Sequence, residues 1–141
     1  MKITVNKELM DEMKAHALET YPFECCGFVF GSDHTKGRQV SEVRRATNSK
    51  QGDQRRRFEI DPLDYLKAER YALENNTTLV GIYHSHPDHP AIPSEHDLKQ
   101  AVPFFSYLIL STAKDQVNKV TSWQLDHQKF EEEEIIEENK S

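Results

Sequence analysis

The spacing of apolar residues changes from helical to strand-like along the chain, and these changes mark the expected elements. Apolar side chains recur at helical spacing over 6–20 and 61–76, and each segment begins with a residue suited to cap a helix, Asn or Asp. Pro62 in the first helical position strengthens the second start. A shorter helix is predicted from Ser94 to about Ala101, because Ser-x-x-Asp is a capping pattern.

Seven segments are rich in apolar, β-branched or aromatic residues at strand-like spacing. They predict strands over Lys2–Val5, Cys26–Gly31, Gln39–Ala46, Leu79–His84, Phe104–Leu110, Val117–Leu125 and Lys129–Ile136. The polar stretch 47–57 lacks periodicity and is predicted to be a loop. Strand and helix order predicts an α+β (α/β-like) domain, with one mixed sheet flanked by two long helices.

The length and composition favour one folded, soluble domain. A chain of 141 residues has room for a single core, which we expect over 1–136, with 137–141 as a disordered tail. No apolar run is long enough to cross a bilayer, and the first residues contain no signal core, so a cytoplasmic protein is expected. Cys25 and Cys26 are adjacent, and neighbouring cysteines rarely meet disulfide geometry, which argues against a disulfide framework.

The net charge of −6 argues against general nucleic-acid binding. Acidic residues gather at Glu131–Glu134, Glu137 and Glu138, and basic residues at Arg55–Arg57. Both charged runs are explained if their side chains lie on the solvent-exposed surface. The alternative is a basic patch that faces an acidic protein partner.

The candidate chemistry lies between Val80 and Asp97. His84 and His86 are two residues apart at the end of a predicted strand, so their rings share a face. Asp97 would complete a three-ligand set with a fourth position open for water, as in catalytic zinc sites. Two alternatives need no metal. The histidines could be hydrogen-bonded in a loop, and Ser94 and Asp97 could serve only as a helix cap.

Two further residues affect this interpretation. Glu24 directly precedes the buried-looking segment Cys25–Gly31, where it suits a general base, although an exposed loop glutamate is the alternative. His89 completes H-x-H-x-D-H, the metal motif of the metallo-β-lactamase fold. That fold needs a longer chain and further downstream ligands, whereas His127 is the only histidine that follows Asp97 here.

Together these residues resemble the JAMM (MPN+) metallopeptidase family, whose motif is an upstream Glu followed by H-[ST]-H-x7-S-x-x-D. Glu24, the run 84–86, Ser94 and Asp97 match every term of this motif. The flanking segments PFECCGFVFG and VGIYHSHPDHPAIPSEHD resemble the small, stand-alone prokaryotic members.

The resemblance implies a JAMM-type fold and one Zn²⁺ held by His84, His86 and Asp97. Glu24 would be the general base and Ser94 would stabilise the oxyanion. The implied substrates are peptide or isopeptide bonds after the C-terminal Gly-Gly of ubiquitin-like or ThiS/MoaD-type sulfur-carrier proteins. The carrier tail would add to a sheet edge, while Arg55–Arg57 would contact the carrier body.

Two other functions remain open at this point. One is a non-catalytic, zinc-containing module that binds such a carrier, although a scaffold does not require a base beside an open metal position. The other is a zinc peptidase that acts on small peptides. The zinc mechanism that the resemblance implies requires no covalent intermediate, so Cys25 and Cys26 need not be nucleophiles, and both cysteines are expected to be packing residues.

Overall fold

The computed structural model describes residues 1–139, which form seven strands and three helices in the predicted order. The strands are β1 (Lys2–Asn6), β2 (Cys26–His34), β3 (Gly37–Ala46), β4 (Thr78–Pro87), β5 (Ser106–Ala113), β6 (Gln116–Asp126) and β7 (Lys129–Glu138). The helices are α1 (Lys7–Thr20), α2 (Pro62–Glu74) and α3 (Glu95–Gln100). Asn6, Asp61 and Ser94 cap the three helices through their side chains, as predicted.

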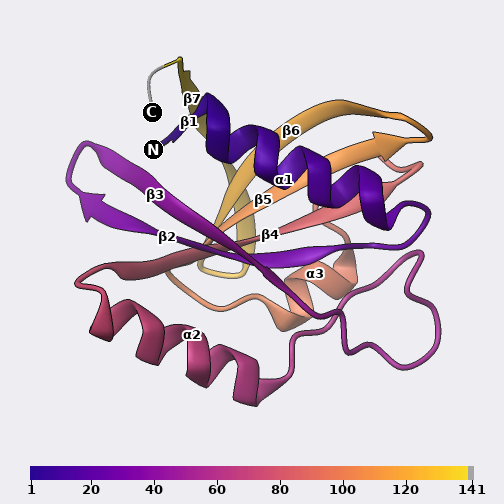
Figure 1. Cartoon of the computed structure of the whole chain (residues 1–141), viewed down its shortest axis with the longest axis horizontal. Coiled ribbons are helices and arrows are strands. Elements are labelled where there is room, and N and C mark those ends of the chain that lie inside the picture. Colours follow the sequence, from indigo (N-terminus) through magenta and orange to yellow (C-terminus); the bar gives the residue numbers. More distant parts are fainter. Residues whose placement is uncertain (140–141) are drawn as a thin grey trace.

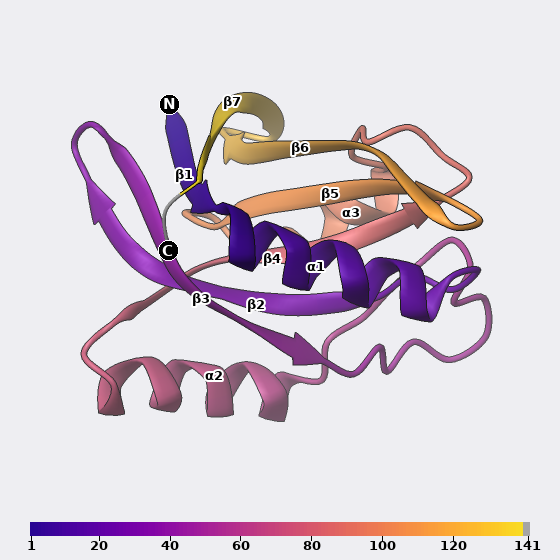
Figure 2. The same ribbon diagram turned by 45° about the horizontal axis from the view of Figure 1, so that its top comes forward.

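All seven strands join in one mixed sheet that closes on itself in the order β1-β3-β2-β4-β5-β6-β7. The strand β1 runs parallel to both β3 and β7, and these pairings close the barrel. The helix α1 covers one face of the curved sheet, while α2 and α3 lie on the other (Figures 1 and 2). The predicted single domain, a mixed sheet flanked by helices, is confirmed. Its closure was not predicted, because pairing between β1 and β7 joins distant segments that carry no local signal.

Alternation along the strands divides the apolar residues between two cores. Tyr83 belongs to the core beneath α1, and its neighbour Ile82 to the core that includes α2. His84 lies two residues beyond Ile82, so it shares the α2 face of β4. Phe58, in the segment that leads to α2, is buried in this second core and stacks on the His84 ring. The α2 core therefore supports the first candidate ligand.

Several predicted strand boundaries were wrong; β4, for example, continues past the predicted end at His84 to Pro87. The strand β2 continues to His34, because its polar residues go on pairing with β3 at the solvent edge. The strand β5 begins only at Ser106, since Phe104 has a φ of 79° in a turn and is 83% exposed. The backbone carbonyl of Phe104 accepts a hydrogen bond from buried Arg38, which fixes this turn.

The C-terminal prediction also requires correction. Glu137 and Glu138 do not belong to a disordered tail, because they are part of β7 and lie opposite Val5 and Asn6 of β1. Residues 140–141 of the predicted tail lie outside the described part of the chain. The acidic run is not uniformly solvated either: Glu133 is buried, and its carboxylate accepts hydrogen bonds from Ser122 and Gln124 at 2.7 Å each.

The two cysteines are free and buried, as expected of packing residues. Within residues 1–139, no helix has both the length and the apolar character needed to cross a membrane. A cytoplasmic location stays a prediction.

Candidate metal centre and active site

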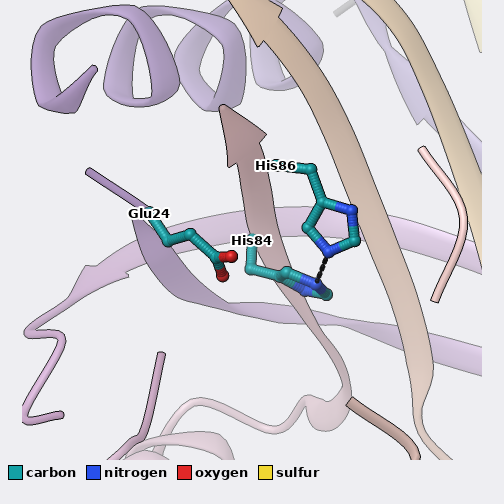
Figure 3. A group of neighbouring side chains, drawn as sticks. All are labelled: Glu24, His84 and His86. Carbon is teal, nitrogen blue, oxygen red and sulfur yellow. Dashed lines mark hydrogen bonds between the residues drawn. The ribbon is translucent and has the colours of Figure 1, made fainter. Parts of the chain in front are cut away.

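The candidate site forms where the start of β2 meets the end of β4. These strands are antiparallel, and Cys26 lies opposite His84. The pairing continues one residue further, because the backbone N–H of Cys25 donates to Ser85 Oγ at 2.8 Å and the N–H of Ser85 donates to the carbonyl of Cys25. Ser85, between the two histidines, therefore fixes the backbone beside Glu24. Figure 3 shows the Glu24 carboxylate directed toward the same space as the two imidazoles.

Three potential ligand atoms converge on one point. The Nε2 atoms of His84 and His86 lie 3.1 Å apart, and Oδ2 of Asp97 lies 3.4 Å and 3.1 Å from them, respectively. Ligands bonded to zinc at about 2.0 Å in a tetrahedron are separated by about 3.3 Å, so this triangle has the dimensions of a zinc face. Glu24 also offers an oxygen within 4.8 Å of both histidines, in a looser arrangement.

Asp97 reaches the histidines because of the way α3 begins. Ser94 and Asp97 form a capping box: the backbone N–H of Asp97 donates to Ser94 Oγ at 3.1 Å, and that of Ser94 donates to Asp97 Oδ2 at 2.9 Å. The same carboxylate oxygen thus accepts the capping bond and faces both imidazoles. Helix capping and a ligand role are therefore compatible in this geometry.

Surrounding contacts orient the two imidazoles. Nδ1 of His86 donates to the carbonyl of Pro90 at 2.9 Å, which leaves Nε2 as the ligand atom. Hydroxyl groups of Ser111 and Thr121 hold the same loop through the carbonyls of His89 and Ala91. The ring of His84 is instead fixed by packing, since it stacks on Phe58 with ring centroids 4.5 Å apart.

Burial sets the protonation of the site. Desolvation, reinforced by the charges of Asp97 and Asp53, raises the pKa of Glu24 to about 9. Burial lowers the pKa of His84, which favours the neutral imidazole that metals bind. Burial opposes ionisation of Asp97, but its contacts with His84, His86 and Ser94 outweigh this and hold the pKa of Asp97 well below its usual range.

These residues fit a divalent cation. Oε1 of Glu24 is buried and has no hydrogen-bond partner among residues 1–139. Orphaned buried polar atoms are costly, so each requires a compensating group. A cation at the triangle would compensate the facing lone pairs of His84, His86 and Asp97, and a water beside it would reach Glu24.

An open cleft of about 600 Å³ gives access to this point. Its lining comprises Glu24, Arg56, Arg57, His86, His89, Pro90, Ile92, Ser94, Glu95 and His96. The predicted Ser94 is therefore at the cleft wall, while Glu24 and His86 form its floor. The arginine run divides, because Arg56 and Arg57 face the cleft whereas Arg55 lies over the ring of Phe23, 5.8 Å from its centroid.

The structure brings together Glu24, His84, His86 and Asp97, all predicted from the sequence, and buries each of them. The exposed-loop alternative for Glu24 is wrong, since this residue is only 2% exposed. His89 stays exposed at the rim, where its backbone carbonyl rather than its ring is bonded.

Sequence reasoning missed two supporting residues. One is Phe58, which is buried and stacks on His84. Its only signal in the sequence was its apolar side chain directly after a polar loop. The other is Asn48, whose amide bonds to the carbonyls of Glu24 and Arg57 at 3.2 and 3.1 Å. An asparagine after a strand indicates a turn, but it does not tell which backbone groups its side chain will bind.

Comparisons with known proteins agree with this geometry. The family model described as prokaryotic homologs of the JAB domain matches residues 6–126. The desampylase of Pyrococcus furiosus is 41% identical over 76 residues, which are 54% of this chain and 50% of that protein, so the match spans half the length of that relative. The probable TtuB-protein conjugate cleaving protease of Thermus thermophilus is 34% identical over 108 residues, 77% of this chain and 69% of that protein.

A solved structure extends the similarity to the whole fold. The solution structure of a protein from Desulfitobacterium hafniense superimposes with a TM-score of 0.86 at 34% identity, over 98% of this chain and 94% of that one. The segment matched by the family model contains Glu24, His84, His86, Ser94 and Asp97. The chain therefore belongs to the prokaryotic JAB-domain family, the stand-alone JAMM/MPN type that its motif resembles.

Proposed function

We propose that this protein is a zinc-dependent metallopeptidase that hydrolyses peptide or isopeptide bonds after the C-terminal Gly-Gly of ubiquitin-like or sulfur-carrier proteins. The observation that carries the proposal is the triangle of His84, His86 and Asp97 ligand atoms, 3.1–3.4 Å apart, beside the buried carboxylate of Glu24. An open cleft leads to these groups. This combination offers a metal position and a base close together at the inner end of one cleft.

His84, His86 and Asp97 would hold the zinc, and Glu24 would stay outside the ligand set. The assignment rests on distance, because Asp97 Oδ2 lies 3.1 Å from His86 Nε2, whereas the Glu24 oxygen is placed only within 4.8 Å of the imidazoles. When bound, zinc supplies Lewis acidity, which lowers the pKa of a water and polarises the scissile carbonyl.

Glu24 would then move one proton from the attacking water to the leaving amine. As the water oxygen bonds to the carbonyl carbon, Glu24 accepts the proton; when the carbon–nitrogen bond breaks, it donates that proton to the amine nitrogen. Burial suits Glu24 to both roles, because its raised pKa makes the carboxylate a stronger base than an exposed one. A nearby cation lowers this pKa and restores the ionised form.

Ser94 would stabilise the charge that develops on the carbonyl oxygen. Its hydroxyl oxygen accepts the capping bond from the N–H of Asp97, so its own hydrogen is available to donate. Ser94 lines the cleft beside His86, which is where a substrate carbonyl has to enter.

The substrate class is supported by the relatives. The Thermus protein is named for cleaving conjugates of TtuB with proteins, and the family resemblance implies carriers that end in Gly-Gly. A flexible Gly-Gly tail is narrow enough to enter an open cleft that a folded protein surface would not. The carrier body would remain outside and contact the rim.

The test is metal content together with cleavage of a ThiS/MoaD-type carrier that is extended beyond its Gly-Gly. We expect about one zinc per chain, cleavage directly after Gly-Gly, and loss of activity on chelation that added zinc reverses. Glu24→Gln should retain zinc and lose at least about 100-fold in kcat, because general acid–base catalysis contributes 10²–10⁴-fold. Glu74→Gln, at the end of α2, is the matched control and should retain full activity.

Other outcomes identify the alternatives. Zinc binding with cleavage of short peptides but of no carrier would indicate a small-peptide peptidase. Zinc binding with carrier affinity but without hydrolysis would indicate a binding module. A purified protein that neither contains nor takes up zinc would overturn the proposal.

A further inference from the structure

A hydrogen bond joins the segment that carries Glu24 to the loop that follows His86. The hydroxyl of Tyr21 donates to the carboxylate of Asp88, whose Oδ1 and Oδ2 lie 2.9 and 2.8 Å away. Tyr21 stands three residues before Glu24, and Asp88 stands two residues after His86. A bond from a hydroxyl to a carboxylate is charge-assisted, and therefore stronger than one between neutral groups. The contact thus connects the neighbourhood of the proposed base to that of a proposed ligand.

The backbone around Glu24 is held differently on its two sides. After it, Cys25 pairs with Ser85 of β4, the strand that carries both histidines. Before it, residues 21–23 belong to no helix or strand, and the hydrogen bonds of their backbone N–H groups return to α1. The backbone of Glu24 itself bonds to the loop 47–57, which carries no ligand. Within the described chain, the Tyr21 hydroxyl is therefore the group of residues 21–23 that hydrogen-bonds to the ligand-bearing side of the site.

Asp88 is held in place by its own backbone. It has a φ of 58°, in the left-handed region that Asp and Asn tolerate better than most other side chains. Its N–H donates to the carbonyl of Thr112 in β5 at 2.7 Å. The turn that follows brings the carbonyl of Pro90 to Nδ1 of His86, at 2.9 Å. Asp88 therefore begins the loop that orients the second proposed ligand.

Both joined segments line the cleft. One contributes Glu24, and the other contributes His89, Pro90 and Ile92. Figure 3 shows Glu24 and His86 reaching toward the same space from two separate segments. A shift of one segment against the other would change the separation between the base and the metal position, on which proton transfer depends. The bond between the two segments opposes that shift.

We propose that Tyr21 and Asp88 are a pair of positioning residues, which keep the Glu24 carboxylate at a fixed separation from the metal position during the reaction. The inference rests on the proposed function and adds two residues to its site. Neither residue is among those that line the cleft, so both act through the backbone of Glu24 and of the loop after His86. Loss of the pair should therefore lower kcat more than it raises KM, with zinc content unchanged.

The experiment removes the donor and the acceptor separately and together. For Tyr21→Phe we expect kcat on the extended carrier to fall about tenfold, because displacements of about 1 Å cost up to about 100-fold, while KM stays within about threefold. Asp88→Gly removes the acceptor and still permits a φ of 58°, so it should lower kcat by a similar factor. Since the two residues act as a unit, the double variant should be no slower than the slower single variant.

Two further variants separate positioning from general loosening. Asp88→Asn tolerates the same backbone and keeps an acceptor oxygen without the charge, so it should recover part of the kcat that Asp88→Gly loses. Tyr71→Phe is the matched control, because the Tyr71 hydroxyl also donates to a carboxylate, that of Glu42, with both oxygens 2.8 Å away. This second pair lies between α2 and β3 and not in the cleft lining, so its loss should leave kcat within about twofold.

Hydrogen exchange supplies a readout that needs neither zinc nor turnover. The N–H of Glu24 donates to the carbonyl of Gln54 at 2.7 Å, so its exchange rate reports local opening of this segment. In metal-free protein, Tyr21→Phe should make this amide exchange about fivefold or more faster, the scale of one lost hydrogen bond, and Tyr71→Phe should not.

The outcomes separate this inference from the proposed function. An active wild type in which Tyr21→Phe leaves kcat or the exchange rate of the Glu24 amide unchanged would overturn this inference alone. A kcat loss of the same size in Tyr71→Phe, or losses that multiply in the double variant, would overturn it as well, since they indicate general loosening or independent effects. If the wild type cleaves no carrier, the proposed function fails and this inference fails with it.

Discussion

The side-chain amide of Asn48 donates to the backbone carbonyl of Glu24 across a distance of 3.2 Å. The same group donates to the carbonyl of Arg57, while Asn48 Oδ1 accepts from the N–H groups of Lys50 and Glu59 at 3.0 and 3.1 Å. One side chain therefore joins the loop 47–57 to the residue that is proposed to carry the proton. This relationship makes Asn48 a positioning residue.

Removal of that link should impair catalysis more than metal binding. For Asn48→Ala we expect kcat to fall about 10- to 100-fold, because small displacements of a catalytic group cost that much, while zinc stays near one per chain. Steady-state kinetics and metal analysis check both expectations. Asn75→Ala is the control, since within residues 1–139 the Asn75 side chain bonds only to its own helix, at the carbonyl of Tyr71. An unchanged kcat in Asn48→Ala would refute a positioning role.

Phe58 should contribute to zinc affinity through its packing on His84. Phe58→Leu retains an apolar core residue but loses the stacked ring, so the imidazole gains freedom that zinc binding must remove. We expect zinc affinity to fall about 10-fold, the scale of losses when a supporting contact of a ligand is removed. Competition with a zinc-binding dye measures the change. Phe105→Leu, in the same core, controls for general loosening and should leave the affinity within about twofold.

Without metal, Glu24 should make stability fall as the pH rises. Its pKa is raised from 4.5 to about 9, so across this range the folded protein holds a proton that the unfolded chain has lost. The free energy of unfolding should therefore decrease with pH, with a slope of at most about 1.4 kcal/mol per pH unit from this group. Urea unfolding of chelator-treated protein between pH 5.5 and 8.5 measures it. Glu24→Gln should flatten this decrease and Glu74→Gln should not; parallel curves for all three proteins would contradict the assignment.

His16 should have the opposite effect at lower pH. Burial, assisted by the charge of Arg45, lowers the pKa of His16 from 6.5 to about 4, and its Nδ1 is hydrogen-bonded to the Tyr83 hydroxyl at 2.6 Å. Between these pH values the unfolded chain binds a proton that the folded protein excludes, so stability is lost as the pH falls from 6.5 toward 4. We expect a loss of about 1–2 kcal/mol, because solvent screens part of the effect.

The measurement is the difference in unfolding free energy between wild type and His16→Gln at pH 5 and pH 7. The variant should lose less stability on acidification than the wild type. His127→Gln provides the control, because the His127 side chain is 98% exposed and its removal should leave the wild-type dependence intact. Equal acid sensitivity of wild type and His16→Gln would exclude His16 as the source.

The sequence was informative where chemistry depends on local spacing. His84 and His86 share a face because they are two residues apart on a strand, and Ser94 and Asp97 form a capping box because they are three apart at a helix start. Closure of the sheet through β1 and β7, and the Asn48 bonds, depend on which distant segments meet, so local patterns did not reveal them. Glu133 was misread for the same reason, since its partners Ser122 and Gln124 are on β6.

The loop 47–57 has a consequence for how related enzymes diversify. Its described residues belong to no strand or helix, and Asn48 and Gln54 anchor it to the segment that carries Glu24. The exposed side chains of residues 51–53 and 55–57 can therefore be exchanged while the barrel and the ligand set remain in place. The preference of related enzymes for one substrate over another could then change through this loop alone, without any change in Glu24 or the three proposed zinc ligands.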